Sequence, residues 1–409
     1  MLTTLIPLFD GTTTVRAYSL FTQKDNFLLN PSHLGTGRFD GLARVDGLDL
    51  VKSMGLATLS DDKEVFVEVN NVSVFSDIES QCPEGREKVV LLFDTSITPD
   101  ENYISRIAVL KRAGFRLAIR KITIPQFDSY NPIIRLMDYA FLDHKKVNIR
   151  NARTILSKLY SNLRLVAVNV NSQEDYDMLV AQGGFDLYEG EFFRMPAVKS
   201  QKDIAPVKIN YIELLNVVNE PNYELTDAAD VISRDPALII SLLKMVNRMS
   251  LNSEITSIRH AAAMLGQKEL KKWISTAVTR ELCADRPGEI TRVSLLRAKF
   301  AENLAPAFGL GGFSSEIFLM GLFSVIDVIL EKPMEEALSL VKLPINVNKA
   351  LLKGEGEYVE ILDFIKQYEN ASWQEVSRQL LLKNISTGAV YDAYAGALEW
   401  YKQLFSEEQ

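Results

Sequence analysis

Short runs rich in β-branched and aromatic residues alternate with segments of helical periodicity along the first half of the chain. The runs are about eight in number and cover residues 2–9, 12–21, 64–69, 88–93, 116–122, 139–142, 164–170 and 185–193. Asp10-Gly11 lies between the first two runs and is typical of a tight hairpin turn. Helical segments such as 99–113, which should begin behind Thr98, separate later runs. Strands and helices that alternate at this spacing predict parallel strands closed into a TIM-like α/β barrel.

The second half of the chain has helical periodicity throughout. Asp235-Pro236 predicts a helix start, because Asp accepts the free amide protons of a first turn and Pro holds the dihedral angle that this turn needs. Ser257 and Gly266 should bound a second, short helix. Apolar residues behind Pro236 predict a helix packed on more than one side: Leu238, Ile239, Leu242, Leu243, Met245, Val246 and Met249. A last helix, 387–405, carries a largely aromatic stripe, typical of core or of a subunit interface: Tyr391, Tyr394, Leu398, Tyr401 and Phe405.

The pattern lapses between residues 194 and 208, where two prolines and scattered charges indicate a linker. A chain of 409 residues is long enough for two domains. We therefore expect a barrel domain at 1–197 and an all-helical bundle at 198–409, with a hinge near Lys202.

Charge and composition narrow the function classes. The net charge of -8 opposes a role in coating nucleic acid, which needs clustered Lys and Arg. Cys82 and Cys283 lie far apart and support neither a disulfide framework nor a zinc ribbon. Without a secretion-signal pattern or an apolar stretch of the ~20 residues that span a bilayer, we expect a cytoplasmic protein without membrane contact. One helix face could still be basic, through Lys268, Lys271, Lys272 and Arg280.

Several motifs in the helical half resemble the HDOD domain. They are D-P-A-L at 235–238, L-L-K-M-V-N at 242–247, the segment 257–266, G-L-F-S-V-I-D at 321–327, Leu343-Pro344 with 350–352, Tyr368-Glu369 and Trp373. This resemblance implies an all-helical relative of HD-type metal phosphohydrolases that lacks the His-Asp metal ligands. The chain indeed contains no His-Asp dipeptide.

The barrel half resembles the EAL domain, whose active members hydrolyse cyclic di-GMP with two metal ions. The framework is similar at I-P-L-F-D (6–10) with Ala17-Tyr18, at 110–115, and at 190–196. A two-metal site needs several carboxylates, because hard divalent cations prefer oxygen ligands. At the positions where the resemblance implies metal ligands, substrate contacts and catalytic groups, this chain has Ser19, Gln23, Glu68, Leu91, Arg120, Lys121, Phe141, Val168, Asn171 and Glu189.

Arg120 and Lys121 stand where the family has paired aspartates, so two positive charges replace two negative ones. We therefore expect a pseudoenzyme with no bound metal and no cofactor. The two cations either form an anion or nucleotide site at the end of a barrel strand, or simply pair with acids and face solvent. The three histidines, His33, His144 and His260, lie in no metal-ligand pattern.

The resulting expectation is a bacterial EAL–HDOD signalling adaptor, without catalytic activity, that binds an unidentified signalling protein or associates into a homodimer. The alternative is a receptor for cyclic di-GMP or another cyclic dinucleotide, or a weak phosphodiesterase, with unusual ligands. A helical module that binds nucleic acid is opposed by the acidic balance of the chain.

Overall fold

The computed structural model describes residues 1–24, 44–147, 156, 158–194, 206–220, 222–249, 255–285 and 288–406. The chain forms two compact units, one of Met1–Met195 with Lys366–Gln409 and one of Pro196–Ile365. These units differ from the expected boundaries, because the last helices join the barrel and not the helical bundle. The expected linker and its hinge near Lys202 lie outside the described residues.

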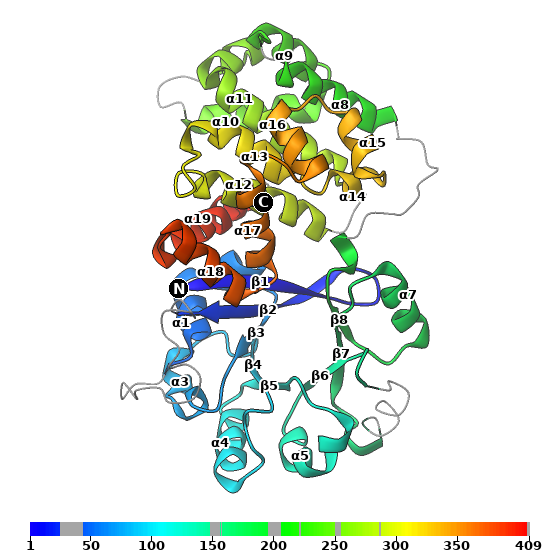
Figure 1. The fold of residues 1–409 in the computed structure, drawn as a ribbon, viewed down its shortest axis with the longest axis vertical. Helices are drawn as coiled ribbons and strands as arrows, with labels where there is room; N and C mark the ends of the chain where they lie inside the picture. Colours follow the sequence, from blue (N-terminus) through cyan, green and yellow to red (C-terminus); the bar gives the residue numbers. More distant parts are fainter. Residues whose placement is uncertain are drawn as a thin grey trace. The chain divides into compact units, whose positions relative to one another are not determined.

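The first unit contains a closed barrel whose eight strands follow one another in chain order (Figure 1). Neighbours from β2 to β8 are parallel, whereas β1 is antiparallel to both β2 and β8. The predicted fold class is therefore confirmed. The strands are β1 Leu2–Phe9, β2 Val15–Gln23, β3 Glu64–Glu68, β4 Val89–Phe93, β5 Arg116–Ile119, β6 Tyr139–Asp143, β7 Arg164–Val168 and β8 Leu187–Glu189.

The link between β1 and β2 is longer than the two-residue turn expected at Asp10-Gly11. It covers residues 10–14, and Asp10 organises it by accepting hydrogen bonds from the amides of Thr12 and Thr14 at 2.8 and 3.1 Å. The Arg16 guanidinium also donates to Asp10, at 2.6 Å. Burial opposes ionisation of Asp10, but these bonds outweigh it and lower its pKa to about 2.

One expected helix cap in the barrel unit is wrong. The helix α4 begins at Glu101 because the side chain of Asp100 accepts the amides of Asn102 and Tyr103. Thr98 only donates its hydroxyl to that Asp100 carboxylate. The helices that precede the second unit in the chain are α1 Asp46–Met54, α2 Leu56–Ser60, α3 Ile78–Gln81, α4 Glu101–Arg112, α5 Phe127–Ile134 and α7 Gln173–Gln182.

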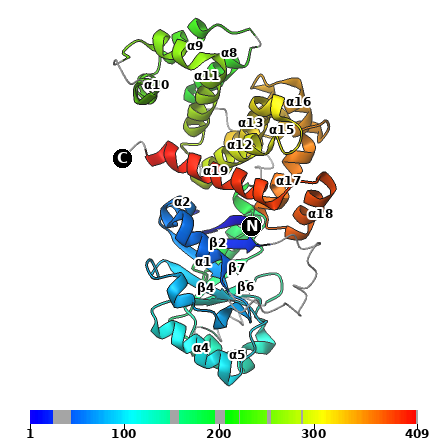
Figure 2. The same ribbon diagram turned by 90° about the vertical axis from the view of Figure 1, so that its left-hand side faces the viewer.

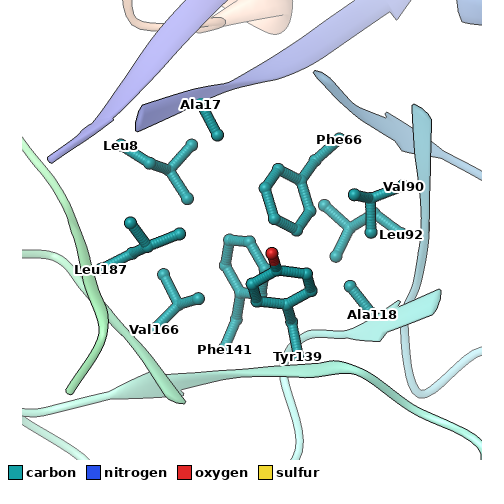
Figure 3. Packing of buried hydrophobic residues seen from close by; sticks show 10 residues of the cluster. All are labelled: Leu8, Ala17, Phe66, Val90, Leu92, Ala118, Tyr139, Phe141, Val166 and Leu187. Carbon is teal, nitrogen blue, oxygen red and sulfur yellow. The ribbon is translucent and has the colours of Figure 1, made fainter. Parts of the chain in front are cut away.

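The barrel interior is filled by side chains from successive strands, which point toward one another in Figure 3. Phe66 packs edge-on against Tyr139 and Phe141, with ring centroids 5.0 and 5.2 Å apart. Because side chains alternate between the two faces of a strand, the remaining strand positions point away from the axis. The interior cluster consists of Leu8, Ala17, Phe66, Val90, Leu92, Ala118, Tyr139, Phe141, Val166 and Leu187.

Two helices from the end of the chain complete the barrel unit, α18 Trp373–Lys383 and α19 Thr387–Ser406 (Figures 1 and 2). The fully buried Tyr368, just before α18, accepts the backbone amide of Thr3 at 3.0 Å. The helix α19 packs against β1 and α2, and its Tyr394 lies against Tyr368. The aromatic stripe of the last helix therefore contributes to the core of the barrel unit.

The second unit is helical, as expected. Asp235 accepts the amides of Ala237 and Leu238, which confirms the helix start at Pro236. The helix α10 buries only one stripe, Leu238, Leu242 and Val246, because it lies at the surface and leaves Met249 63% exposed. Its helices are α8 Pro206–Asn219, α9 Leu225–Ile232, α10 Pro236–Met249, α11 Ile258–Leu282, α12 Gly288–Leu304, α13 Ser314–Phe323, α14 Ile326–Leu330, α15 Met334–Ser339, α16 Ile345–Asn348 and most of α17 Val359–Glu369.

The long helix α11 is two helices in sequence, because Gly266 has φ 71° and ψ 168°, outside the helical region. The Ser257 side chain accepts the amide of His260 at the start of the first helix. Both expected bounds of the short helix are thus confirmed, and the second helix begins at Gln267. Among the described helices, none combines the length and the apolar character that a membrane span requires.

We predict that Tyr368→Phe lowers the free energy of unfolding of the barrel unit by about 1–3 kcal/mol, because the Thr3 amide would remain buried without an acceptor. Urea unfolding of the full chain and hydrogen exchange at Thr3 measure the effect. Tyr391→Phe is the control, since Tyr391 is half-buried on α19 and no described residue bonds to its hydroxyl. Equal midpoints for Tyr368→Phe and wild type would contradict the assigned role.

Asp10→Asn should reduce the unfolding free energy by about 1–2 kcal/mol at pH 7, discounted for the exposed Arg16. A carboxyl with a lowered folded pKa stabilises the fold above its unfolded pKa near 4 and loses that effect as pH falls through about 2. The difference between variant and wild type should therefore vanish in this window. Asp392→Asn, at an exposed position of α19, should show no such pH dependence.

Candidate functional site

The carboxyl ends of strands β2 to β8 form one mouth of the barrel, where active sites of such folds lie. A cavity of about 250 Å³ opens there. Among its lining residues are Glu68 from the end of β3, Asp94 just past β4, and Arg120 and Lys121 just past β5. The mouth therefore contains both acids and cations.

Arg120 is the central cation of this mouth. Its guanidinium lies 3.5 Å from the Glu68 carboxylate and 3.7 Å from the Glu189 carboxylate. The same group lies over the rings of Phe21 and Phe141, 5.0 and 5.9 Å from their centroids. With its side chain only 17% exposed, Arg120 is held between two acids and two aromatic rings.

Glu189 is itself buried, and its other carboxylate oxygen accepts the Ser19 hydroxyl at 2.8 Å. Gly190 follows, and its place requires glycine because a Cβ there would lie 2.0 Å from the Val170 carbonyl oxygen. This close approach lets the Phe192 amide donate to the same carbonyl, at 3.1 Å. The end of β8 is thereby fixed beside Arg120.

Lys121 pairs with the remaining acid of the mouth. Its ammonium group lies 2.8 Å from the Asp94 carboxylate, and its backbone is left-handed, with φ 61°. Burial opposes ionisation of Asp94, but hydrogen bonds from Lys121 and Ser96 outweigh it and hold its pKa below the usual value. Desolvation in the mouth raises the pKa of Glu68, although Arg120 and Lys121 act in the opposite direction.

The expected position of Leu91 within the site is wrong. Val90 and Leu92 belong to the interior cluster, so Leu91 between them faces away from the barrel axis (Figure 3). The mouth-facing positions of this strand are Leu92 and, past its end, Asp94. Sequence reasoning missed Asp94, which could have been found by counting every second residue along the strand.

The other expected positions are spread between core, rim and surface. Phe141 is buried in the interior cluster, Val168 packs against that cluster, and Asn171 is exposed. Gln23 at the end of β2 donates its side-chain amide to the hydroxyl of Ser377 on α18, at 3.1 Å. The position where the resemblance implies a substrate-holding arginine is therefore used to pack a helix of the same unit.

The acid at the end of β6 is also engaged. Asp143 accepts the side-chain amide of Asn169 at 2.8 Å and lies 3.3 Å from the Lys146 ammonium. The neighbouring His144 is buried, and its Nδ1 lies 2.8 Å from the Val168 carbonyl oxygen. His260 is exposed on the helical unit, and His33 lies outside the described residues. His144 and His260 thus lie in different units.

These side chains do not fit a two-metal centre. Glu68, Glu189 and Asp94 each face a cation from the chain itself. Within the part of the chain that the structure describes, no three His, Cys, Asp or Glu side chains are grouped so that they could hold a metal ion. Arg120 and Lys121 thus meet the acids of the mouth, as the salt-bridging alternative expects, whereas an anion site at this position stays a prediction.

Comparison with known proteins identifies the helical unit first. The HDOD domain model matches residues 204–351, which confirms the resemblance seen in the motifs. The chain is also related to the cyclic di-GMP phosphodiesterase CdgJ of Vibrio cholerae, with 25% identity over 325 residues that cover 78% of this chain and 74% of CdgJ.

Among solved structures, a standalone EAL protein from Vibrio cholerae O395 in its c-di-GMP bound form is 19% identical. It has a TM-score of 0.37 and covers 50% of this chain and 95% of that chain. The uncharacterized protein YuxH of Bacillus subtilis (strain 168) is 30% identical over 363 residues, 86% of this chain and 87% of YuxH. The chain therefore belongs to the same protein family as YuxH, with a closed barrel in one unit and an HDOD domain in the other.

Proposed function

We propose that this chain is a catalytically inactive adaptor of cyclic di-GMP signalling that acts by binding another protein. Its relation to CdgJ, which is named a cyclic di-GMP phosphodiesterase, supports the pathway. The position of Arg120 between Glu68 and Glu189 is the observation that supports the lack of catalysis. In this arrangement the chain supplies the positive charge that a metal ion would otherwise bring to the mouth.

The electrostatic argument is strong enough to decide between metal binding and its absence. A divalent cation about 5 Å from the Arg120 guanidinium would be repelled by on the order of 7 kcal/mol, at an effective dielectric constant near 20. It would also have to win Glu68 and Glu189 from that guanidinium. Metal-assisted attack by water on a phosphodiester needs ions held by several free carboxylates. The mouth therefore favours a structural role over hydrolysis.

The rim of the mouth supports the same proposal. Ser377 on α18 takes the side-chain amide of Gln23, so a position that would hold substrate instead anchors a helix. Arg194, after β8, pairs with Glu369 at 3.0 Å on the same side of the sequence gap. A barrel whose mouth and rim are committed to internal contacts is suited to present a fixed surface to a partner.

We predict that the full-length protein forms no linear dinucleotide from cyclic di-GMP with millimolar Mg²⁺ or Mn²⁺, as followed by chromatography. Because the mouth offers no free set of carboxylates, product should stay at the level of the protein-free blank. CdgJ, assayed in parallel, is the positive control. Metal-dependent product that disappears in Glu189→Gln would instead establish catalysis at this mouth.

Calorimetric titration with cyclic di-GMP separates the adaptor from the receptor alternative. The adaptor proposal expects no heat of binding at the barrel with or without metal. Micromolar binding that is lost in Arg120→Gln but retained in Lys88→Gln, at an exposed lysine outside the mouth, would assign a receptor function to Arg120. The adaptor role would then have to be given up.

A further inference from the structure

The helical unit contains a cavity of about 510 Å³, which lies within the size range of small-molecule sites. Its walls come from the end of α8, the second helix of α11, α13 and the segment 342–345. All of them belong to the same compact unit. The cavity includes Leu343-Pro344, which the sequence motifs singled out but which the barrel mouth does not explain.

Four lysines line this cavity, against two glutamates. Lys268, Lys271 and Lys272 share one face of their helix, so three members of the expected basic face converge here. Lys272 is paired with Glu302, 2.6 Å away, whereas Lys268 and Lys271 have no ion-pair partner among the described residues. Burial lowers the pKa of Lys271, although Glu316 acts in the opposite direction. The cavity thus holds cationic groups that an anion would stabilise.

Asn219, at the end of α8, gives an independent indication of a ligand. Its side chain lines the cavity and the residue is only 9% exposed, yet neither the amide nitrogen nor the amide oxygen has a hydrogen-bond partner among the described residues. A buried amide without partners costs about 1–3 kcal/mol for each unmet group. A ligand with an adjacent donor and acceptor would satisfy both atoms at once.

The remaining wall is apolar. Phe318 and Leu319 of α13 face Leu343 and Pro344 across the cavity lining. The Lys272 ammonium lies 5.1 Å from the centroid of the Phe318 ring, which keeps a positive charge beside a flat apolar surface. Such a wall suits a planar ring better than a sugar or a bare inorganic ion.

We propose that this cavity is a binding site for a nucleoside monophosphate or a ligand of the same chemistry, a phosphate joined to a planar heterocycle with an amide-like edge. The phosphate binds at Lys268 and Lys271, the ring lies against the apolar wall, and Asn219 recognises the edge of the ring. The cavity lies within the helical unit, so its ligand does not depend on what the barrel does.

A folded nucleic acid is the less suitable occupant. A cavity of this volume holds one nucleotide-sized group, whereas duplex binding needs a basic surface that follows many phosphates. Glu220 and Glu316 at the cavity would also repel a continuous phosphate backbone. The convergence of lysines on one enclosed space therefore favours a single small anion.

The test is calorimetric titration of the full-length protein with AMP, GMP, CMP and UMP, and separately with inorganic phosphate and with the parent nucleosides. At least one monophosphate should bind ten-fold or more tightly than either its nucleoside or phosphate alone. Lys271→Met should weaken the monophosphate at least ten-fold. Lys244→Met, an exposed lysine on α10 outside the cavity, is the matched control and should leave the affinity unchanged.

Asn219→Leu supplies a readout that a purely structural asparagine would not give. Removing two unmet polar atoms should raise the thermal midpoint of the ligand-free helical unit, while monophosphate affinity falls at least ten-fold. No binding of any monophosphate at millimolar concentration would overturn the proposal, and so would equal affinities in Lys271→Met and Lys244→Met. Tighter binding of a single-stranded RNA oligonucleotide than of every monophosphate would assign the lysines to nucleic acid instead.

Discussion

Closure of eight strands into one barrel is the constraint on which the first unit depends. It forces every second side chain of each strand toward a common axis, so a row of apolar residues fills the interior and the next inward position of each strand meets the others at the mouth. At that mouth the inward positions include Glu68, Asp94, Arg120 and Glu189. Whatever these four side chains are, they must neutralise one another or bind something, because they share a small and partly desolvated space.

In this chain they neutralise one another. The guanidinium of Arg120 serves two carboxylates and stacks on two aromatic rings, and Lys121 serves a third carboxylate from a left-handed backbone position. The acids have therefore not been emptied from the mouth, as a reading of the substituted positions alone suggests. They remain, with cations of the protein in place of ions from solution, which preserves the electrostatic balance of the fold without its chemistry.

The sequence was a good guide where local pattern decides the structure. Alternating apolar residues located the eight strands, and Asp235 and Gly266 marked helix bounds through hydrogen bonding and backbone freedom that depend on a few neighbouring residues. It failed where distant segments meet. Leu91 was misplaced by one residue of register, and no local pattern shows that Gln23 bonds to Ser377, 354 positions later. The lysines of α11 were visible as a basic face, but their convergence with Asn219 was not.

The contact between Thr3 and Tyr368 has a consequence for how this protein is made. The ribosome completes all eight strands and then the whole helical unit before it reaches the residue that accepts the Thr3 amide. During that interval β1, which is antiparallel to both of its neighbours, lacks the helices that cover it. A nascent barrel in this state offers a binding surface for chaperones. For the same reason, a fragment cut after the barrel strands is a poor substitute for the native unit, whereas a circularly permuted chain that joins residues 366–406 directly to the barrel would bring the two parts of the unit together early.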